Sequence, residues 1–206
     1  MYKLLTADGS SCNGGVAKWH LPTQAADGSW MPGDWMPPID NPKLCSRGYH
    51  LLPDLWDILE WEGAALFAAE GRGATDFGTG KSAVEEARLL RLVTATLRQS
   101  LTLFSADCAE RVLYLYEAAY AQDMRPRKAI ETTRAWALNP TDENAAAWAT
   151  ARATVRDAAR AAGDAAWDAA RAAAWDAAGA AGHAAGAAEL EWQKRHLAEL
   201  LGEVPA

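Results

Sequence analysis

Apolar and polar residues follow two different patterns along this chain, and the change falls near residue 104. Residues 2–7 alternate loosely and end at the turn signal Asp8-Gly9, which predicts a first strand. Residues 64–70 also have a strand-like pattern, and residues 82–93 fit a strand better than the helix that their glutamates and arginines allow. Beyond the change, apolar positions recur at helical spacing in an alanine-rich background, which predicts helices.

The stretches between the predicted strands carry turn and breaker residues. Residues 22–43 are rich in tryptophan and proline, so they predict a loop and not a helix or a central strand. A second strand is predicted near residues 16–21, and a strand or turn at 47–52 is followed by a short helix at 53–61. Residues 75–80 predict a turn-rich connector.

Capping signals place the helices of the second half. Asp107 lies three residues before Glu110, a capping-box spacing that predicts a helix start at Asp107. Pro126 predicts the first turn of a second helix, which Asn139-Pro140 ends. The apolar side of the first helix is predicted to contain Val112, Leu113, Leu115, Tyr116 and Tyr120. Glycines in the alanine-rich tract predict further helices at 142–162, 164–178 and 184–201.

These patterns predict an α+β fold. A small β-rich N-terminal domain with a Trp/Pro-rich loop is expected at residues 1–104, and an all-α, alanine-rich helical bundle at residues 105–206. Alanine favours helices but buries little apolar area, so much of the bundle core is expected to come from tryptophans. These tryptophans are Trp136, Trp148, Trp167 and Trp192.

The formal net charge of -7 is spread over both halves, and neither half is basic. Binding to duplex nucleic acid depends on clustered Lys and Arg, so such a partner is not expected. The three cysteines are widely spaced and odd in number, which argues against a disulfide framework and suits a reducing cytosol. Because neither a signal peptide nor an uncharged apolar span is visible, we expect a cytoplasmic protein without a membrane partner.

One candidate site is a ladder of charged and aromatic residues in the alanine-rich tract. At the helical period, one face carries Trp148, Arg152, Arg156, Arg160, Asp164, Asp168, Arg171 and Trp175. Arg and Trp are enriched at binding hot spots, so this face predicts a surface for a partner protein or an anion. The alternative is a set of ion pairs between neighbouring helices.

A second candidate lies at the start of the second predicted helix, where Arg125, Arg127 and Lys128 cluster. The free N–H groups and the dipole of a helix start favour an anion, which predicts docking of a phosphate or an acidic partner. The alternative is that these cations pair with Glu117 and Asp123.

An alternative cleft is expected in the N-terminal half, where Tyr49, His50, Glu70 and Arg72 could converge. On the competing interpretation, the first two are half-buried structural residues and the last two form an ion pair. The spacing of Cys and His predicts no metal site, and neither a phosphate-binding loop nor a nucleophile elbow is present. We therefore expect no catalytic residue, metal or cofactor.

Two segments carry a resemblance to a known family. Ala106–Leu113 reads Ala-Asp-Cys-Ala-Glu-Arg-Val-Leu, and Arg125–Glu131 reads Arg-Pro-Arg-Lys-Ala-Ile-Glu and is followed by Arg134 and Trp136. With the alanine-rich helices behind them, residues 103–200 resemble the helical immunity-protein family found beside bacterial toxins and in phage genomes. This resemblance implies an all-α domain that acts by binding and carries no catalytic residue.

The N-terminal half resembles pieces of uncharacterised phage proteins. The shared features are a Cys-x-x-Gly-aromatic-His element at Cys45–His50, a Glu-Gly-x-Gly turn at Glu70–Gly73 and an Arg-Leu-Leu strand at Arg88–Leu90. The arrangement is also similar to ADP-ribosyltransferase-like units, in which an aromatic-bearing strand precedes a helix.

These observations favour a non-enzymatic phage or mobile-element protein that inhibits a bacterial toxin or defence system by protein contact, in an immunity-like or anti-defence role. The alternative is a nucleotide or small-molecule binder that sequesters a signalling nucleotide or acts as an ADP-ribosyltransferase-like enzyme, with the N-terminal cleft as its site. A third alternative is a structural role in which the alanine-rich face forms homo-oligomers.

Overall fold

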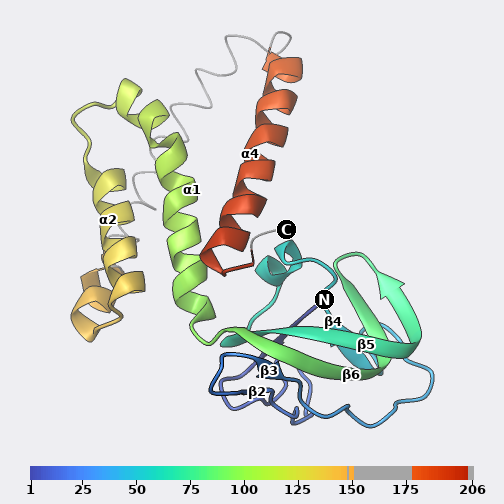
Figure 1. The fold of residues 1–206 in the computed structure, drawn as a ribbon. Coiled ribbons are helices and arrows are strands. Elements are labelled where there is room, and N and C mark those ends of the chain that lie inside the picture. The colour runs from blue at the N-terminus through green and yellow to red at the C-terminus, as the bar shows by residue number, and fades with distance from the viewer. Residues whose placement is uncertain (148, 151–177, 204–206) are drawn as a thin grey trace. The chain divides into compact units, whose positions relative to one another are not determined.

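The structure is a computed structural model that describes residues 1–147, 149–150 and 178–203. The chain divides into two compact units (Figure 1). The first, which we call the sheet unit, joins Met1–Arg98 to the residues that begin at Leu201. The second, the helical unit, spans Gln99–Leu200.

The sheet unit is built around four antiparallel strands in the order β1-β5-β6-β4. The two edge strands meet because the backbones of Tyr2 and Leu52 exchange hydrogen bonds of 2.7 and 2.9 Å. The strands therefore form a nearly closed ring, which leaves few unpaired edges and encloses a core. Their bounds are Tyr2–Leu5 for β1, Tyr49–Leu51 for β4, Ala65–Gly78 for β5 and Lys81–Thr94 for β6.

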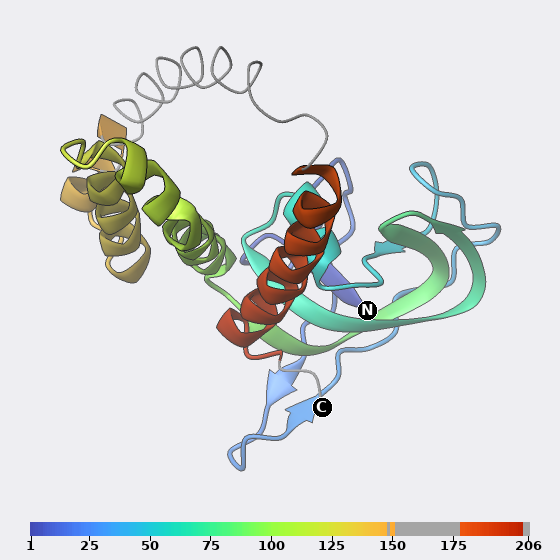
Figure 2. The same ribbon diagram turned by 90° about the horizontal axis from the view of Figure 1, so that it is seen from above.

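Strands β5 and β6 form a long curved hairpin (Figure 2). Gly80 in its two-residue loop has a φ of +70°, the left-handed conformation that such loops favour. The register shifts after Arg72, where Gly73 has a φ of +78°. There the Glu85 carboxylate accepts a 2.8 Å hydrogen bond from the backbone N–H of Ala74. A bulge bends its strand, so this feature helps the hairpin to curve around the core.

The Trp/Pro-rich segment is ordered along the edge of β6. The backbone N–H groups of Gly33, Met36 and Ile39 donate hydrogen bonds of 2.9, 2.8 and 3.0 Å to carbonyls of β6. Two short strands, β2 (Thr23–Gln24) and β3 (Trp30–Met31), pair with each other ahead of it. The prediction that residues 22–43 hold neither a helix nor a central strand is confirmed.

Trp35 fastens this segment to the hairpin. Its ring lies under two guanidinium groups, with the Arg72 carbon at 4.0 Å and the Arg88 carbon at 4.7 Å from the ring centroid. Arg72 in turn pairs with Glu86 at 2.7 Å, and Arg88 pairs with Glu70. Such cation–π contacts are worth about 0.5–2 kcal/mol each, so the segment packs on β5 and β6 as a fixed part of the fold.

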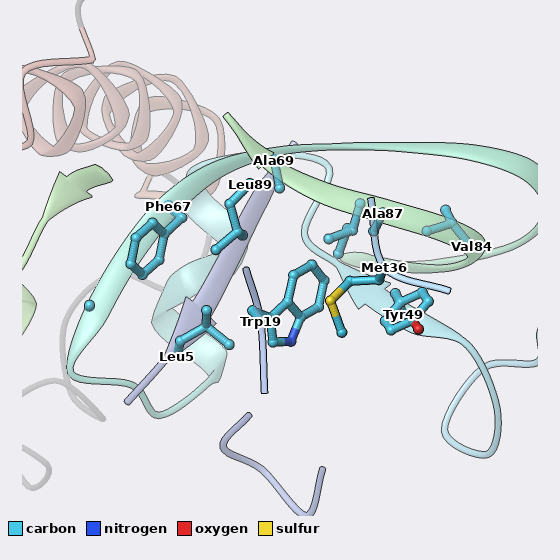
Figure 3. Packing of buried hydrophobic residues seen from close by; sticks show 11 residues of the cluster. Leu5, Trp19, Met36, Tyr49, Phe67, Ala69, Val84, Ala87 and Leu89 are labelled. Carbon is cyan, nitrogen blue, oxygen red and sulfur yellow. The ribbon is translucent and has the colours of Figure 1, made fainter. Parts of the chain in front are cut away.

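Trp19 lies within the core of the sheet unit, among eleven clustered buried residues (Figure 3). Its ring meets Tyr49 edge-on, with the ring centroids 5.4 Å apart. Its Nε1–H donates a 3.1 Å hydrogen bond to the hydroxyl of Ser11. The ring therefore contributes a large buried apolar area while its one polar group stays satisfied.

Among the described residues, the helical unit contains α1 (Leu97–Ala119), α2 (Arg125–Leu138) and α4 (Ala178–Leu200). In Figures 1 and 2, α1 lies between α2 and α4. The apolar cluster that α1 and α2 share is small and consists of Ala106, Leu113 and Ile130. Because this cluster buries little apolar area, polar contacts between the helices take a larger part in holding them together.

The predicted fold class, a small β-rich domain followed by an all-α bundle, is wrong, because the long strands β5 and β6 lie in the middle of the chain and the residues that begin at Leu201 belong again to the sheet unit. The sheet continues through β6 to Thr94, and α1 begins at Leu97. The residues after α4 return to the sheet unit, where the carboxylate of Glu203 accepts hydrogen bonds from Arg91 at 2.5 Å and from the Tyr2 hydroxyl at 3.1 Å. The long hairpin thus lies in the middle of the chain, and the described residues that follow α4 belong to the sheet unit together with the N-terminal strands.

Several strand boundaries also differ from the prediction. Residues 75–78, expected in a connector, belong to β5, because the glycines before them form a bulge within the strand and do not end it. In place of the strand expected at 16–21, the structure has an isolated bridge between Ser10 and Lys18. The strand at 82–93 is confirmed, and the first strand is shorter than expected.

The helix boundaries were predicted unevenly. The start of α2 at Arg125 and its end before Asn139 are confirmed. α1 begins at Leu97 and not at Asp107, whose carboxylate binds side chains of other helices and caps no helix start. α4 contains the glycines expected to interrupt it, since one glycine costs a helix only about 1 kcal/mol. In the helix expected at 142–162, residues 142–147 and 149–150 are helical. The rest of that helix lies outside the described residues, and so does the helix expected at 164–178, apart from its last residue.

Candidate functional site

Three helices of the helical unit meet at the side chain of Asp107. Its Oδ1 accepts hydrogen bonds from Nε and a terminal nitrogen of Arg134 on α2, at 3.0 and 2.5 Å. Its Oδ2 accepts a 2.7 Å hydrogen bond from Nε2 of His196 on α4. The Arg134 guanidinium also binds Glu110, one turn further along α1, at 2.5 Å. We call these four residues the Asp107 junction, and it ties both α2 and α4 to α1.

The electrostatics of this junction favour the ionised form of Asp107. Burial alone would raise its pKa, but the hydrogen bonds and charges of Arg134 and His196 outweigh burial and lower the pKa below its ordinary value. The hydrogen bond from Arg134 likewise lowers the pKa of Glu110. The Asp107 side chain is only 22% exposed, so its ion pairs are less screened than those at the open surface.

Aromatic and charged side chains extend the junction between α1 and α4. The His196 imidazole stacks on Trp192 with the ring centroids 4.7 Å apart. The guanidinium carbon of Arg111 lies 3.9 Å from the Trp192 ring centroid, and the same group pairs with Glu189 at 2.9 Å. These side chains therefore serve the packing of α4 on α1.

The cations expected at the start of α2 are placed there, and two of them have partners within the chain. Arg125 binds Asp123 through two hydrogen bonds of 2.7 and 2.5 Å. Arg127 binds both carboxylate oxygens of Glu117 at 2.8 Å. Lys128 is exposed, and no ion pair of its side chain occurs among the described residues. The alternative interpretation, in which these cations pair with Glu117 and Asp123, therefore holds for Arg125 and Arg127.

α1 exposes several apolar and aromatic side chains, two of which were predicted to belong to its apolar side. Val112 and Leu115 lie one helical turn apart and are 51% and 59% exposed, and Tyr114 is 65% exposed. Of the apolar side predicted for this helix, Leu113 is buried, as the prediction requires. The prediction is wrong for Val112 and Leu115, because α2 and α4 cover other sides of α1.

The ladder expected in the alanine-rich tract lies outside the described residues. Its members are Trp148, Arg152, Arg156, Arg160, Asp164, Asp168, Arg171 and Trp175. Of the tryptophans expected in the helical core, Trp136 is buried and Trp192 is half-buried.

The four residues of the alternative cleft fall into two separate pairs. Tyr49 and His50 lie on β4 and line a cavity of the sheet unit. Glu70 and Arg72 lie on β5 and do not line it. They pair with residues of β6 across the hairpin, Arg72 with Glu86 at 2.7 Å, and not with each other.

The cavity has a volume of about 520 Å³ and is lined by segments far apart in the sequence. One wall is the element Cys45–His50, and another is the loop at residues 11–17. Three cations line it, Lys3, Arg47 and Lys81, and no carboxylate of the described residues does. These cations carry no local signal in the sequence, because a lysine or arginine in a strand or loop is ordinarily a solvated surface residue.

His50 has a defined state in this cavity. Its Nε2 accepts a 2.9 Å hydrogen bond from the backbone N–H of Cys45, which places the ring proton on Nδ1. Burial, together with the charges of Lys3 and Lys81, lowers the pKa of His50 from its ordinary value of 6.5. The ring is therefore neutral near pH 7, and the cavity is electropositive through its lysines and arginine.

The described residues also bear on metal binding and on membrane spanning. Within the described ranges, no group of three His, Cys, Asp or Glu side chains is placed to hold a metal ion. Among the helices that the structure describes, none combines the length and the apolar character needed to span a membrane.

Comparison with known proteins places the helical unit in a family. The model of the family described as "Imm-5 like putative immunity protein" matches residues 91–199, just over half of the chain. Its range contains the whole Asp107 junction and confirms the immunity-protein resemblance. The searches of curated proteins and of solved structures returned no match. The chain thus belongs to the Imm-5 like family of immunity proteins.

Proposed function

We propose that this protein binds a bacterial toxin and inhibits it, and that a phage or another mobile element encodes it. The observation that carries the proposal is the family match over residues 91–199. The ion pairs of the Asp107 junction support it, because helices fixed in advance lose little freedom on binding and so form a good contact surface. The resemblance of the element Cys45–His50 to phage proteins favours the proposed origin.

The exposed side of α1 is the contact surface that we favour. Val112 and Leu115, one helical turn apart on one side of α1, are each more than half exposed, and Tyr114 is more than half exposed on another side of the helix. Contiguous apolar and aromatic residues at the surface of a protein mark sites of protein contact. Lys128, exposed at the start of α2, and the partly exposed Arg125 supply charge for a polar rim.

The proposed surface also includes residues that the sequence selected. Arg127 belongs to it through the start of α2. A separate candidate contact is the ladder of the alanine-rich tract, which lies outside the described part of the chain and contains Trp148, Arg152, Arg156, Arg160, Arg171 and Trp175.

Calorimetric titration of the full chain with candidate bacterial toxins tests this proposal. We expect a complex with a dissociation constant below micromolar. Leu115→Asp should weaken it at least tenfold, because a buried carboxylate without a partner opposes association. Phe77→Asp, at a residue of the sheet unit that is 76% exposed, is the matched control and should leave binding unchanged. Absence of a complex at micromolar concentrations contradicts the proposal.

A further inference from the structure

The cavity of the sheet unit lies outside residues 91–199, so family membership does not account for it. Its volume of about 520 Å³ falls within the range of about 300–1,000 Å³ that is usual for sites of small organic molecules. The side chains with ionisable groups that line it are Lys3, Cys12, Cys45, Arg47, Tyr49, His50 and Lys81.

Lys3 occupies a position on β1 that faces the core. Side chains two residues apart point to the same face of a strand, and Leu5, two residues on, is fully buried in the core cluster. The ammonium of Lys3 lies 5.1 Å from the ring centroid of Trp19 and donates a 2.9 Å hydrogen bond to the carbonyl of His50. Burial lowers the pKa of Lys3 to about 8. A charged lysine on the inward face lowers the stability of the fold. Such a cost is typical of side chains that serve binding.

The cations around the cavity differ from other cations of the sheet unit in their partners. No carboxylate pairs with Lys3, Arg47 or Lys81 among the described residues, and Nζ of Lys81 instead donates to the thiol of Cys45 at 3.0 Å. Elsewhere in the unit, cations do pair with carboxylates: Lys18 with Asp8, Arg72 with Glu86, Arg88 with Glu70 and Arg91 with Glu203. In a chain of net charge -7, three such cations around one hollow point to an anionic occupant.

The wall formed by Cys45–His50 has a backbone that holds its shape. Gly48 has a φ of +100°, and a Cβ added there would lie 2.8 Å from Cβ of Pro42 and 3.0 Å from the carbonyl oxygen of Val84. Only glycine fits this position without strain. The wall therefore presents Arg47 beside the neutral ring of His50.

We propose that this cavity binds a small phosphate monoester, with the phosphate at Lys3, Arg47 and Lys81. A monoester phosphate carries about two negative charges near pH 7, which suits a site with three cations better than a single carboxylate does. The cavity also exceeds the size of a phosphate group, and the apolar side chains of Ile39 and Leu52 line the remainder for an organic part. This site is independent of toxin inhibition, so either proposal can fail without the other.

Isothermal titration of the full chain with phosphate esters of different organic parts tests the assignment. The probes are adenosine 5′-monophosphate, uridine 5′-monophosphate, glucose 6-phosphate and glycerol 3-phosphate, with inorganic phosphate, adenosine and glucose for comparison. Because the phosphate is the shared feature, each ester should bind in the millimolar range or tighter. The best ester should bind at least tenfold more tightly than inorganic phosphate, and adenosine and glucose should not bind.

Four variants separate the site from general charge effects. Lys3→Met, Arg47→Met and Lys81→Met should each weaken the best ester at least tenfold. Lys18→Met, which removes a surface lysine paired with Asp8 outside the cavity, should leave its affinity within twofold. The melting temperature of ligand-free Lys3→Met should not fall below that of the natural chain, because the variant removes a desolvated charge.

Three results would overturn the proposal. One is that no ester binds at 5 mM. Another is that inorganic phosphate binds as tightly as the best ester, which assigns the site to free phosphate. The third is that Arg47→Met, a change at an exposed side chain that the fold tolerates, binds the best ester as tightly as the natural chain.

Discussion

Nε2 of His196 lies 2.7 Å from Oδ2 of Asp107, although 89 positions separate the two residues in the sequence. The other oxygen of the same carboxylate binds Arg134, so one side chain of α1 holds a residue of α2 and a residue of α4. The segment Ala106–Leu113, which carries the family resemblance, thus contains the residue that organises the helical unit.

Replacing Asp107 should destabilise the helical unit more than any surface carboxylate does. Asp107→Ala leaves Arg134 and His196 without their shared acceptor, and we expect a loss of about 2–3 kcal/mol in the free energy of unfolding. Urea denaturation followed by circular dichroism at helical wavelengths measures it. Glu110→Ala, at a side chain that is 48% exposed, is the control and should cost less than about 1 kcal/mol. Equal losses in the two variants contradict the role assigned to the junction.

The helical unit should lose stability in acid through Asp107. Its pKa lies below the ordinary value of 3.8 in the folded chain, so between these two values the unfolded chain binds more protons. The stabilisation by Asp107 is therefore complete above about pH 5 and falls as the pH drops through the folded pKa. Comparing urea midpoints of the natural chain and Asp107→Asn from pH 6 to pH 3 checks this. The gap between them should narrow towards pH 3, and a constant gap contradicts the expectation.

Lys3→Met should stabilise the ligand-free protein near neutral pH. Burial lowers the pKa of Lys3 from 10.5 to about 8, so the charged lysine costs the folded state up to about 3 kcal/mol below pH 8. Above pH 8 the unfolded chain binds more protons and the natural chain gains stability, until about pH 10.5. Burial also raises the pKa of Cys12, so this thiol lowers the stability of the folded state as the pH rises above 9. This effect is the same in the natural chain and in Lys3→Met. Melting temperatures at pH 7 and pH 10 measure the difference, and a variant less stable at pH 7 contradicts it.

Gly48→Ala should distort the wall of the cavity. The substitution meets both a positive φ and close contacts with Pro42 and Val84, for which we expect a loss of about 2–4 kcal/mol. Gly14→Ala is the matched control, since Gly14 has a φ of +83° with nothing within 4 Å of its added Cβ. Only the conformational cost of about 1 kcal/mol remains there. Thermal unfolding of the two variants compares them, and a Gly48→Ala variant no less stable than Gly14→Ala would contradict the packing described here.

Local signals in the sequence located many elements but not their lengths. Pro126 and Asn139 mark the ends of α2 correctly, because capping and proline chemistry act within one turn. Strand β5 is longer than predicted, because Gly73 sits in a bulge that the partner strand stabilises through Glu85. The early start of α1 has a signal that could have been used, since Leu97, Leu101 and Phe104 recur at helical spacing ahead of Asp107.

The cavity depends on tertiary contacts that periodicity does not report. Lys3 precedes two consecutive leucines, Leu4 and Leu5, so the alternation of β1 leaves open which of its faces is inward. Arg47 and Lys81 reach the same hollow only because β4 pairs with β6. The element Cys45–His50 was selected from the sequence, but Glu70 and Arg72, which were expected beside it, do not line the cavity.

Protection of growing bacteria tests the central claim of toxin inhibition most directly. A bacterial toxin that the natural chain binds is induced in cells that express the natural chain, Leu115→Asp or Phe77→Asp at equal levels, and surviving colonies are counted. We predict that the natural chain and Phe77→Asp restore survival at least a hundredfold over cells without the protein, and that Leu115→Asp restores at most a tenth as many colonies. Survival equal to that of unprotected cells, with the natural chain present and folded, would contradict the account.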